Sequence, residues 1–304
     1  MYFLDLQING YYGADFNADD LTAEALHSAC EKLHDAGAVG ILATIITADA
    51  EAMTRRLRRL AQLRGQDELA KKIIQGIHIE GPFLSDVPGY VGAHPAEHTC
   101  DANVELARRL LDAAGGLTRI VTLAPERDPN FQTTRYLADS GIRVSAGHCN
   151  PSLDQLLAAV DSGLAMFTHL GNGCPLMMHR HDNIIQRALS LADRLWIGLI
   201  ADGVHIPFFA LASYLRSASI DRCFVVTDAI AAAGQGPGTY RLGDQEVIVD
   251  EQLATWSPDR SHLMGSASTM PRIVENLRAH VGLSDDQIEM LTRMNPRRAI
   301  GLTE

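Results

Sequence analysis

The chain has 304 residues, of which 46% are hydrophobic and 21% are charged, and its net charge at pH 7 is −11. This length and composition are typical of a soluble globular protein with one large α/β domain or two small ones. The negative charge argues against binding to nucleic acid or to anionic membranes, because phosphate groups require clustered Lys and Arg. The sequence also has no run of about 18 apolar residues that could span a membrane.

The cysteines and the N-terminus indicate the cytoplasm. We expect no signal peptide, because residues 1–5 have no basic region ahead of an apolar stretch. The cysteines are odd in number and lack paired zinc-ribbon spacing, so we interpret them as reduced thiols. They are Cys30, Cys100, Cys149, Cys174 and Cys223.

Short apolar, β-branched segments recur along the chain and predict strands. They are residues 2–8, 39–47, 73–79, 119–124, 142–146, 165–168, 196–201 and 223–227. The stretches between them have helical spacing, with a capping-box pattern at Ser152 and Gln155. The basic cluster at residues 55–59 interleaves with apolar positions at this spacing, so we interpret it as the solvated face of a helix.

This alternation predicts a closed barrel. Near-continuous apolar strands that alternate with helices imply a parallel sheet buried on both faces. Eight such units favour a (β/α)₈ TIM barrel over an open doubly wound sheet, and no G-x-G-x-x-G motif follows the first segment. We interpret the glycine-rich residues 234–238 as a long loop after the eighth strand. Residues 1–304 are therefore expected to form a single catalytic domain.

Polar residues gather where these strands end, which is where the active sites of such barrels lie. They are Gln7, Asn9, His78, Glu80, His148, His169, His205 and Asp228. One histidine at a strand end is more often a hydrogen-bonded structural residue than a ligand. Several histidines together with two carboxylates at corresponding strand ends are difficult to explain by packing alone.

These polar residues at the strand ends favour the interpretation of a metal site. Glu80, His148 and His169 are a plausible three-ligand set for zinc or a similar divalent ion, with a position left open for water. Asp228 would then accept the proton of that water. The alternative for Asp228 is a helix N-cap, which the following glycine-rich segment weakens. Because three ligands complete the set, we do not expect Cys149 or Cys174 to bind the ion.

Motifs at these same positions resemble those of the N-acetylglucosamine-6-phosphate deacetylases of the amidohydrolase superfamily. They are His-Ile-Glu-Gly-Pro at 78–82, Gly-Ala-His-Pro at 92–95, Val-Thr-Leu-Ala-Pro-Glu at 121–126, Ser-Ala-Gly-His at 145–148, Thr-His-Leu at 168–170, Ala-Asp-Gly-Val-His at 201–205, Val-Thr-Asp-Ala at 226–229 and Asn-Pro-x-x-Ala-Ile-Gly at 295–301. Each motif alone is weak. Together they follow the family order across nearly the whole chain.

The resemblance implies a role for each of these residues. Glu80, His148 and His169 correspond to the metal ligands, and Asp228 corresponds to the catalytic acid/base. His205 and Arg180 correspond to residues that bind the sugar phosphate, in the family sometimes across a dimer interface, so a homodimer is expected. The residues themselves allow Arg180 equally well to be a solvated loop charge. Further substrate contacts are implied at Ala93, His94, Asn172, Gly173, Leu263, Met264 and Gly265.

One variant motif within the family and two departures from its common pattern carry expectations. Most amidohydrolases carry a His-x-His motif on the first strand, which supplies two ligands for a second metal ion. Gln7 and Asn9 resemble the Gln-x-Asn variant of this motif, whose amides lack the basic nitrogens that a second ion would need. We therefore expect one divalent metal, with zinc favoured. The chain has no counterpart of the family's usual small β-sandwich, so we expect a bare barrel. Gly171 and Gly173 replace larger residues, which we expect to enlarge or loosen the pocket.

The expected reaction is deacetylation of N-acetylglucosamine-6-phosphate to glucosamine-6-phosphate and acetate. One alternative keeps this chemistry but takes N-acetylgalactosamine-6-phosphate, an unphosphorylated N-acyl sugar or a larger acyl group. A more remote alternative is a barrel that binds a sugar phosphate without hydrolysing it. The intact set of metal-ligand types and Asp228 argues against that alternative, because a binding protein needs no base beside a metal.

Overall fold

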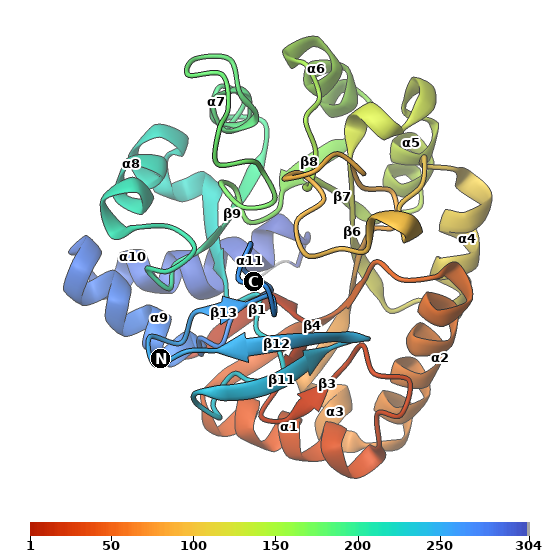
Figure 1. The fold of residues 1–304 in the computed structure, drawn as a ribbon, viewed down its shortest axis with the longest axis vertical. Coiled ribbons are helices and arrows are strands. Elements are labelled where there is room, and N and C mark those ends of the chain that lie inside the picture. The colour runs from red at the N-terminus through yellow and green to blue at the C-terminus, as the bar shows by residue number, and fades with distance from the viewer. Residues whose placement is uncertain (303–304) are drawn as a thin grey trace.

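The computed structural model describes residues 1–302, and eight parallel strands lie at its centre (Figure 1). They are β1 (Phe3–Ile8), β4 (Ala38–Ile46), β5 (Ile74–Glu80), β6 (Thr118–Leu123), β7 (Arg143–Ala146), β8 (Leu164–Phe167), β9 (Trp196–Ile200) and β10 (Cys223–Val226). Each begins and ends within one residue of the segment that the sequence predicts. The predicted TIM barrel is therefore confirmed.

The strands follow the chain order around the barrel, and the first and last strands, β1 and β10, meet near Asp228. Neighbours pair in parallel from β1 through β4 to β10. Between β1 and β10, a parallel bridge joins Ile8 to Ala229, and the backbone N–H of Asn9 donates to the carbonyl of Ala229 at 2.7 Å. The barrel thus closes at the C-terminal ends of its first and last strands, beside Asp228.

Helices surround the strands (Figure 1). They are α1 (Ala23–Asp35), α2 (Ala50–Gln66), α3 (Glu68–Ile73), α4 (Val104–Ala113), α5 (Gln132–Asp139), α6 (Leu153–Asp161), α7 (Ile184–Leu189), α8 (Phe208–Ala218), α9 (Met270–Asn276), α10 (Asp285–Glu289) and α11 (Asn295–Ala299). Short 3-10 helices lie at Ala96–His98, Pro125–Arg127, Pro129–Phe131 and Ile220–Arg222, and π-helical turns lie at Leu277–Val281 and Met290–Met294. In residues 1–302, no helix combines the length and apolar character that a membrane span requires.

The predicted capping box is present at the start of α6. The Ser152 hydroxyl accepts the backbone N–H of Gln155, and the Gln155 side chain accepts the backbone N–H of Ser152. These bonds satisfy two donors that would otherwise lack a partner at the helix N-terminus.

Apolar side chains fill the inside of the barrel as well as the space under the helices. The inner cluster joins strands from all around the barrel and includes Leu4, Leu42, Ile120, Met166 and Phe224, with Ala299 of α11. A larger cluster packs the outer face of the sheet against the helices. Because the interior is packed, the space for chemistry lies at the C-terminal mouth, as in other barrels of this class.

The chain after β10 contains structure that the sequence analysis missed. Residues 238–256, in part interpreted as loop, form an antiparallel sheet of β11 (Gly238–Leu242), β12 (Gln245–Val249) and β13 (Thr255–Trp256). A second small sheet pairs β2 (Gly10–Tyr11) with β3 (Ala14–Asp15). The residues directly after Asp228 form a β-bridge and turns, not a helix, so the helix N-cap alternative for this residue is wrong.

The tip of the β11–β12 hairpin is held to the barrel by residues of the basic cluster and of β3. Arg56 donates to Asp19 and to Asp244, each at 2.9 Å, and its side chain is only 3% exposed. Asp15 accepts the backbone N–H of Gly243 at 2.6 Å. The interpretation of residues 55–59 as a solvated face is therefore wrong for Arg56, which is buried because it bridges two carboxylates.

Candidate active site

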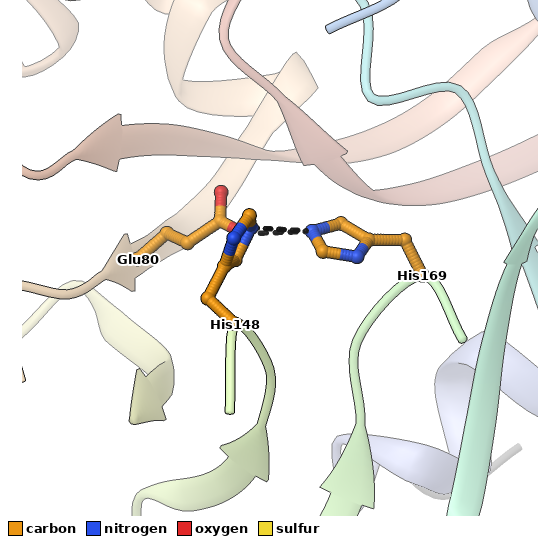
Figure 2. Close-up of side chains that lie close together, drawn as sticks. All are labelled: Glu80, His148 and His169. Atoms are coloured by element: carbon orange, nitrogen blue, oxygen red, sulfur yellow. Dashed lines mark hydrogen bonds and ion pairs between the residues drawn. The ribbon is translucent and has the colours of Figure 1, made fainter. Parts of the chain in front are cut away.

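Three side chains from three neighbouring strand ends converge at the mouth of the barrel. Glu80 is the last residue of β5, and His148 and His169 each lie two residues beyond the end of β7 and β8. Figure 2 shows the two imidazoles and the carboxylate pointing at one another. Glu80 Oε1 lies 2.9 Å from His169 Nε2 and 3.4 Å from His148 Nε2, and the two nitrogens are 3.2 Å apart. All three residues are buried.

The donor set fits a divalent cation. The Nδ1 atom of His148 lies 3.0 Å from the carbonyl oxygen of Tyr90, to which it must donate, so its Nε2 presents a lone pair to the cluster. The three separations are close to the edge of a tetrahedron with bonds of about 2.0–2.1 Å, which is roughly 3.3 Å. A cation placed between the two Nε2 atoms and the Glu80 oxygen could accept all three as ligands at these separations. Nitrogen and oxygen donors of this kind suit a divalent transition-metal ion.

The backbone at the site is strained. His148, His169 and Asp228 have φ values of 50°, 28° and 51°, in the left-handed region that residues other than glycine seldom adopt. Each lies just beyond a barrel strand, where the chain must turn sharply to direct a side chain into the mouth. Such strain is typical of functional sites.

Two glycines form a slot for the His148 ring. A Cβ built on Gly173 would lie 2.7 Å from His148 Nδ1, and one built on Gly92 would lie 2.8 Å from its Cε1. Both distances are far shorter than van der Waals contact. Gly173 therefore permits the backbone to approach the imidazole closely, and the expectation that it loosens the pocket is wrong.

At Gly171 the space is also occupied. A Cβ at this position would meet the ring of Tyr214, from α8, at 3.3 Å. The aromatic ring of Tyr214 thus lies against the backbone where the sequence has no side chain. The expected enlargement of the pocket does not follow from this glycine either.

Amide side chains from β1 hold the two carboxylates of the site. The Gln7 amide nitrogen donates to Glu80 Oε2 at 3.0 Å and to Asp228 Oδ1 at 3.2 Å, and that of Asn9 donates to the same Asp228 oxygen at 2.7 Å. Burial, together with the negative charge of Glu80, raises the pKa of Asp228 to about 6. Gln7 and Asn9 therefore act as hydrogen-bond donors. Gln7 bonds both carboxylates and so holds Glu80, a predicted metal ligand, beside Asp228, the predicted base.

A further buried carboxylate supports Asp228 from behind. Asp5 accepts the hydroxyl of Thr227 at 2.6 Å and the backbone N–H groups of Gln7 and Thr227. These bonds tie the strand that carries Gln7 to the residue before Asp228. The sequence analysis did not single out Asp5, because an aspartate in a strand has no signature of this role.

His205 forms a pair with a carboxylate of its own loop. Its Nδ1 lies 2.7 Å from Asp202 Oδ2, and both side chains are almost fully buried. Burial by itself lowers the pKa of His205, but the charge and hydrogen bond of Asp202 outweigh it, so the pKa is raised. The sequence analysis named His205 but assigned no role to Asp202.

His78 and His94 differ in their relation to the mouth. His78 is a structural residue, since its nitrogens lie 3.2 Å from the carbonyl of Leu6 and 2.7 Å from the hydroxyl of Thr122. His94 packs edge-on against His148 at 4.3 Å between ring centroids, and its Nε2 lies 4.0 Å from Glu80. Burial, with the neighbouring His148, lowers the pKa of His94 to about 3, so its ring is neutral.

A cavity of about 620 Å³ opens onto these residues. Most of the predicted substrate contacts line it, namely Ala93, His94, Asn172, Gly173, His205, Leu263 and Gly265. Met264 is buried behind this wall, and Arg180 is exposed and does not line the cavity. Leu242 and Trp256, which the sequence analysis missed, contribute apolar surface from the small antiparallel sheet.

The comparisons with known proteins identify relatives of this chain. The chain is 33% identical to an N-acetylglucosamine-6-phosphate deacetylase of Bacillus subtilis, over 98% of its own length and 74% of the relative's. It is 33% identical to the Bos taurus enzyme of the same name, over 99% of its own length and 74% of the relative's. An Escherichia coli relative named N-acetylgalactosamine-6-phosphate deacetylase is 28% identical, with 99% and 77% covered.

Solved structures give the same result. A mutant of the N-acetyl-D-glucosamine-6-phosphate deacetylase of Mycobacterium smegmatis, solved in complex with N-acetyl-D-glucosamine-6-phosphate, superposes with a TM-score of 0.89 at 30% identity and covers 99% of this chain and 77% of that one. No family model matches the chain. The similarity to curated relatives over 98–99% of this chain shows that the chain belongs to the N-acetylglucosamine-6-phosphate deacetylase family.

Proposed function

We propose that this protein hydrolyses the acetamide of N-acetylglucosamine-6-phosphate. Water adds to the amide carbonyl, the C–N bond breaks, and the products are acetate and glucosamine-6-phosphate. The observation that carries the proposal is the convergence of Glu80, His148 and His169 beside Asp228 at the mouth of the barrel. The names of the relatives support the substrate.

We expect Glu80, His148 and His169 to hold one divalent ion, with zinc favoured by the nitrogen and oxygen donors. When bound, such an ion polarises the amide carbonyl and lowers the pKa of water towards about 7. The amides of Gln7 and Asn9 are donors to Glu80 and Asp228, which supports a single ion, because a protein amide offers no basic nitrogen to a second one.

The proton transfers fall to Asp228. Its carboxylate accepts a proton from the attacking water and returns it to the departing amine. Asn9 and Gln7 orient Oδ1 of Asp228, which supports proton transfer through Oδ2. His94, which is neutral, offers one N–H to the oxyanion that develops on the carbonyl oxygen.

Phosphate recognition involves His205 and, by family resemblance, Arg180. Arg180 lies outside the cavity of its own chain, on a loop with the exposed apolar residues Leu176 and Met177. Phe209 at the start of α8 is also 80% exposed. Large exposed apolar side chains favour contact with another protein surface. We therefore propose a homodimer in which Arg180 reaches the phosphate in the partner's cavity.

The alternative substrate is N-acetylgalactosamine-6-phosphate, which is favoured by the name of the Escherichia coli relative. The five free thiols are consistent with our expectation of a cytoplasmic enzyme, in which residues 1–304 act as one catalytic domain.

Acetate release from purified protein tests the proposal. The zinc-loaded protein is assayed with N-acetylglucosamine-6-phosphate, its galacto epimer and unphosphorylated N-acetylglucosamine. We expect the highest kcat/KM for the first substrate. Faster turnover of the galacto epimer would replace the proposed substrate with the alternative, and no acetate from any of the three would overturn the reaction.

A further inference from the structure

The residues that line the cavity contain an imbalance of charge. Glu80 and Asp228 are carboxylates, and none of the described residues around the cavity is a lysine or an arginine. The whole chain is also acidic, with a net charge of −11. A phosphorylated sugar carries up to two negative charges, so binding it requires a cation or strong hydrogen-bond donors. Within one chain, the histidines are the candidates.

His205 differs from the other histidines around the cavity because a carboxylate outside the metal cluster holds it. Asp202 Oδ1 accepts the backbone N–H of Val204 at 2.9 Å and that of His205 at 2.8 Å, and its Oδ2 accepts from His205 Nδ1 at 2.7 Å. The Asn276 side chain of α9 donates to the carbonyl of Asp202 at 3.1 Å. Contacts other than the one with the imidazole therefore hold the Asp202 carboxylate in place.

This contact decides which nitrogen of His205 is available. Nδ1 must carry a hydrogen, because it faces a carboxylate oxygen. Among residues 1–302, the hydrogen bonds of His205 involve its backbone N–H and Nδ1 and leave Nε2 without a protein partner, although His205 lines the cavity. Other charges also act on the ring: Asp228 at the end of β10 favours the cation, and His169 disfavours it. Asp202 supplies the larger effect.

We propose that Asp202 is a positioning residue for phosphate recognition, which holds His205 as a cation whose Nε2–H donates to the phosphate of the sugar. The proposal rests on the proposed function, because it takes the phosphorylated substrate as given. A charge-assisted hydrogen bond is shorter and stronger than a neutral one. Asp202 thus determines how strongly the enzyme prefers phosphorylated over unphosphorylated sugars, and it touches neither substrate nor metal ligands.

The substitution Asp202→Asn tests this role. An asparagine retains an oxygen for the two backbone N–H groups but removes the charge that holds the cation. We expect kcat/KM for N-acetylglucosamine-6-phosphate to fall by about tenfold or more through KM, with kcat nearly unchanged. The kcat/KM for unphosphorylated N-acetylglucosamine should change by less than about twofold, because that substrate makes no ionic contact with His205.

Asp128→Asn is the matched control. Asp128 is another buried carboxylate that accepts two backbone N–H groups, from Thr133 and Thr134, but it faces no histidine and does not line the cavity. The Asp128→Asn variant should leave the preference for the phosphorylated over the unphosphorylated sugar unchanged. An equal fall of kcat/KM for both substrates in Asp202→Asn, or an unchanged ratio, would overturn the proposal.

A second variant covers the case in which Asp202→Asn does not fold. His205→Gln leaves Asp202 and its backbone contacts in place, and it should reduce the preference for the phosphorylated sugar at least as strongly. Calorimetry with glucosamine-6-phosphate and glucosamine gives a readout that needs no turnover. Discrimination between these two ligands that is as strong in His205→Gln as in the wild type would overturn the proposal. Wild-type protein that discriminates between them but releases no acetate would contradict only the reaction.

Discussion

Asn9 donates a hydrogen bond of 2.7 Å to the Asp228 carboxylate, across the seam where β1 and β10 close the barrel. The contact holds the proposed base by a neutral donor. It therefore orients the carboxylate without a positive charge that would lower its basicity.

The substitution Asn9→Ala should reduce turnover without loss of the metal. Asp228 would keep only the longer bond from Gln7 at 3.2 Å, so its carboxylate would rotate more freely. We expect kcat to fall by about 10- to 100-fold with a smaller change in KM, since positioning acts mainly on the chemical step. Steady-state kinetics and metal analysis of the same sample check this. Metal loss in the variant would contradict an orienting role.

Gly173→Ala should weaken metal binding through His148. The added Cβ would lie 2.7 Å from Nδ1 of the imidazole, so the ring must move out of its slot. Gly115→Ala is the matched control, because Gly115 has nearly the same φ, 60° against 61°, and nothing lies within 4 Å of its Cβ position. Both variants carry the backbone strain of a positive φ. Competition with a zinc chelator should show a weaker metal affinity for Gly173→Ala only, and equal affinities would contradict the slot.

Removal of the metal should lower the stability of the fold. Two imidazole nitrogens and a carboxylate oxygen lie within 3.4 Å of one another, so the folded chain holds the proposed ligands together. A ligand that binds only the folded state stabilises it by about 2.7 kcal/mol at 100 times its Kd. We expect chelation to lower Tm and to abolish acetate release, with zinc restoring both. Unchanged Tm after verified metal removal would contradict the site.

The pH dependence of stability should report Asp5. Burial raises the pKa of its carboxyl from 3.8 to about 7, although hydrogen bonds from Thr227 and Gln7 oppose the shift. The folded state therefore binds the proton more tightly than the unfolded state. The contribution of Asp5 is full below pH 4 and is lost as pH rises to 7.

The substitution Asp5→Asn isolates this contribution. A shift from 3.8 to about 7 corresponds to a loss on the order of 4 kcal/mol in the unfolding free energy between these pH values. The wild-type protein should lose stability relative to Asp5→Asn by this order as pH rises from 4 to 7. Denaturant unfolding of both chelated proteins at several pH values measures the difference. A difference that does not change with pH would contradict the shift.

The sequence predicted those parts of the site that depend on the order of elements along the chain. Glu80, His148, His169 and Asp228 follow apolar strands, and parallel strands of a barrel bring their C-terminal ends to one mouth. The positions of the strand ends therefore predicted that these four side chains lie together. The helix cap at Ser152 was equally predictable, because a capping box involves residues only three apart.

Features that depend on contacts between distant residues were not predictable in this way. The buried Arg56 donates a hydrogen bond to Asp244, which lies 188 residues later in the chain. No local sequence pattern predicts this pairing. Gly173 was expected to enlarge or loosen the pocket, but the imidazole of His148 occupies the space that a side chain at this position would fill. The hairpin that carries Leu242 follows glycine-rich residues that resemble a loop.

The most direct test of the account is the substitution Asp228→Asn, measured for acetate release and for metal content together. An asparagine retains the size of the side chain but cannot accept and return a proton. We predict that turnover of N-acetylglucosamine-6-phosphate falls below detection, while the protein keeps one equivalent of metal and binds glucosamine-6-phosphate as the wild type does. Substantial turnover in this variant, or loss of the metal with the substitution, would contradict the assignment of Asp228 as the acid/base beside a Glu80, His148 and His169 metal site.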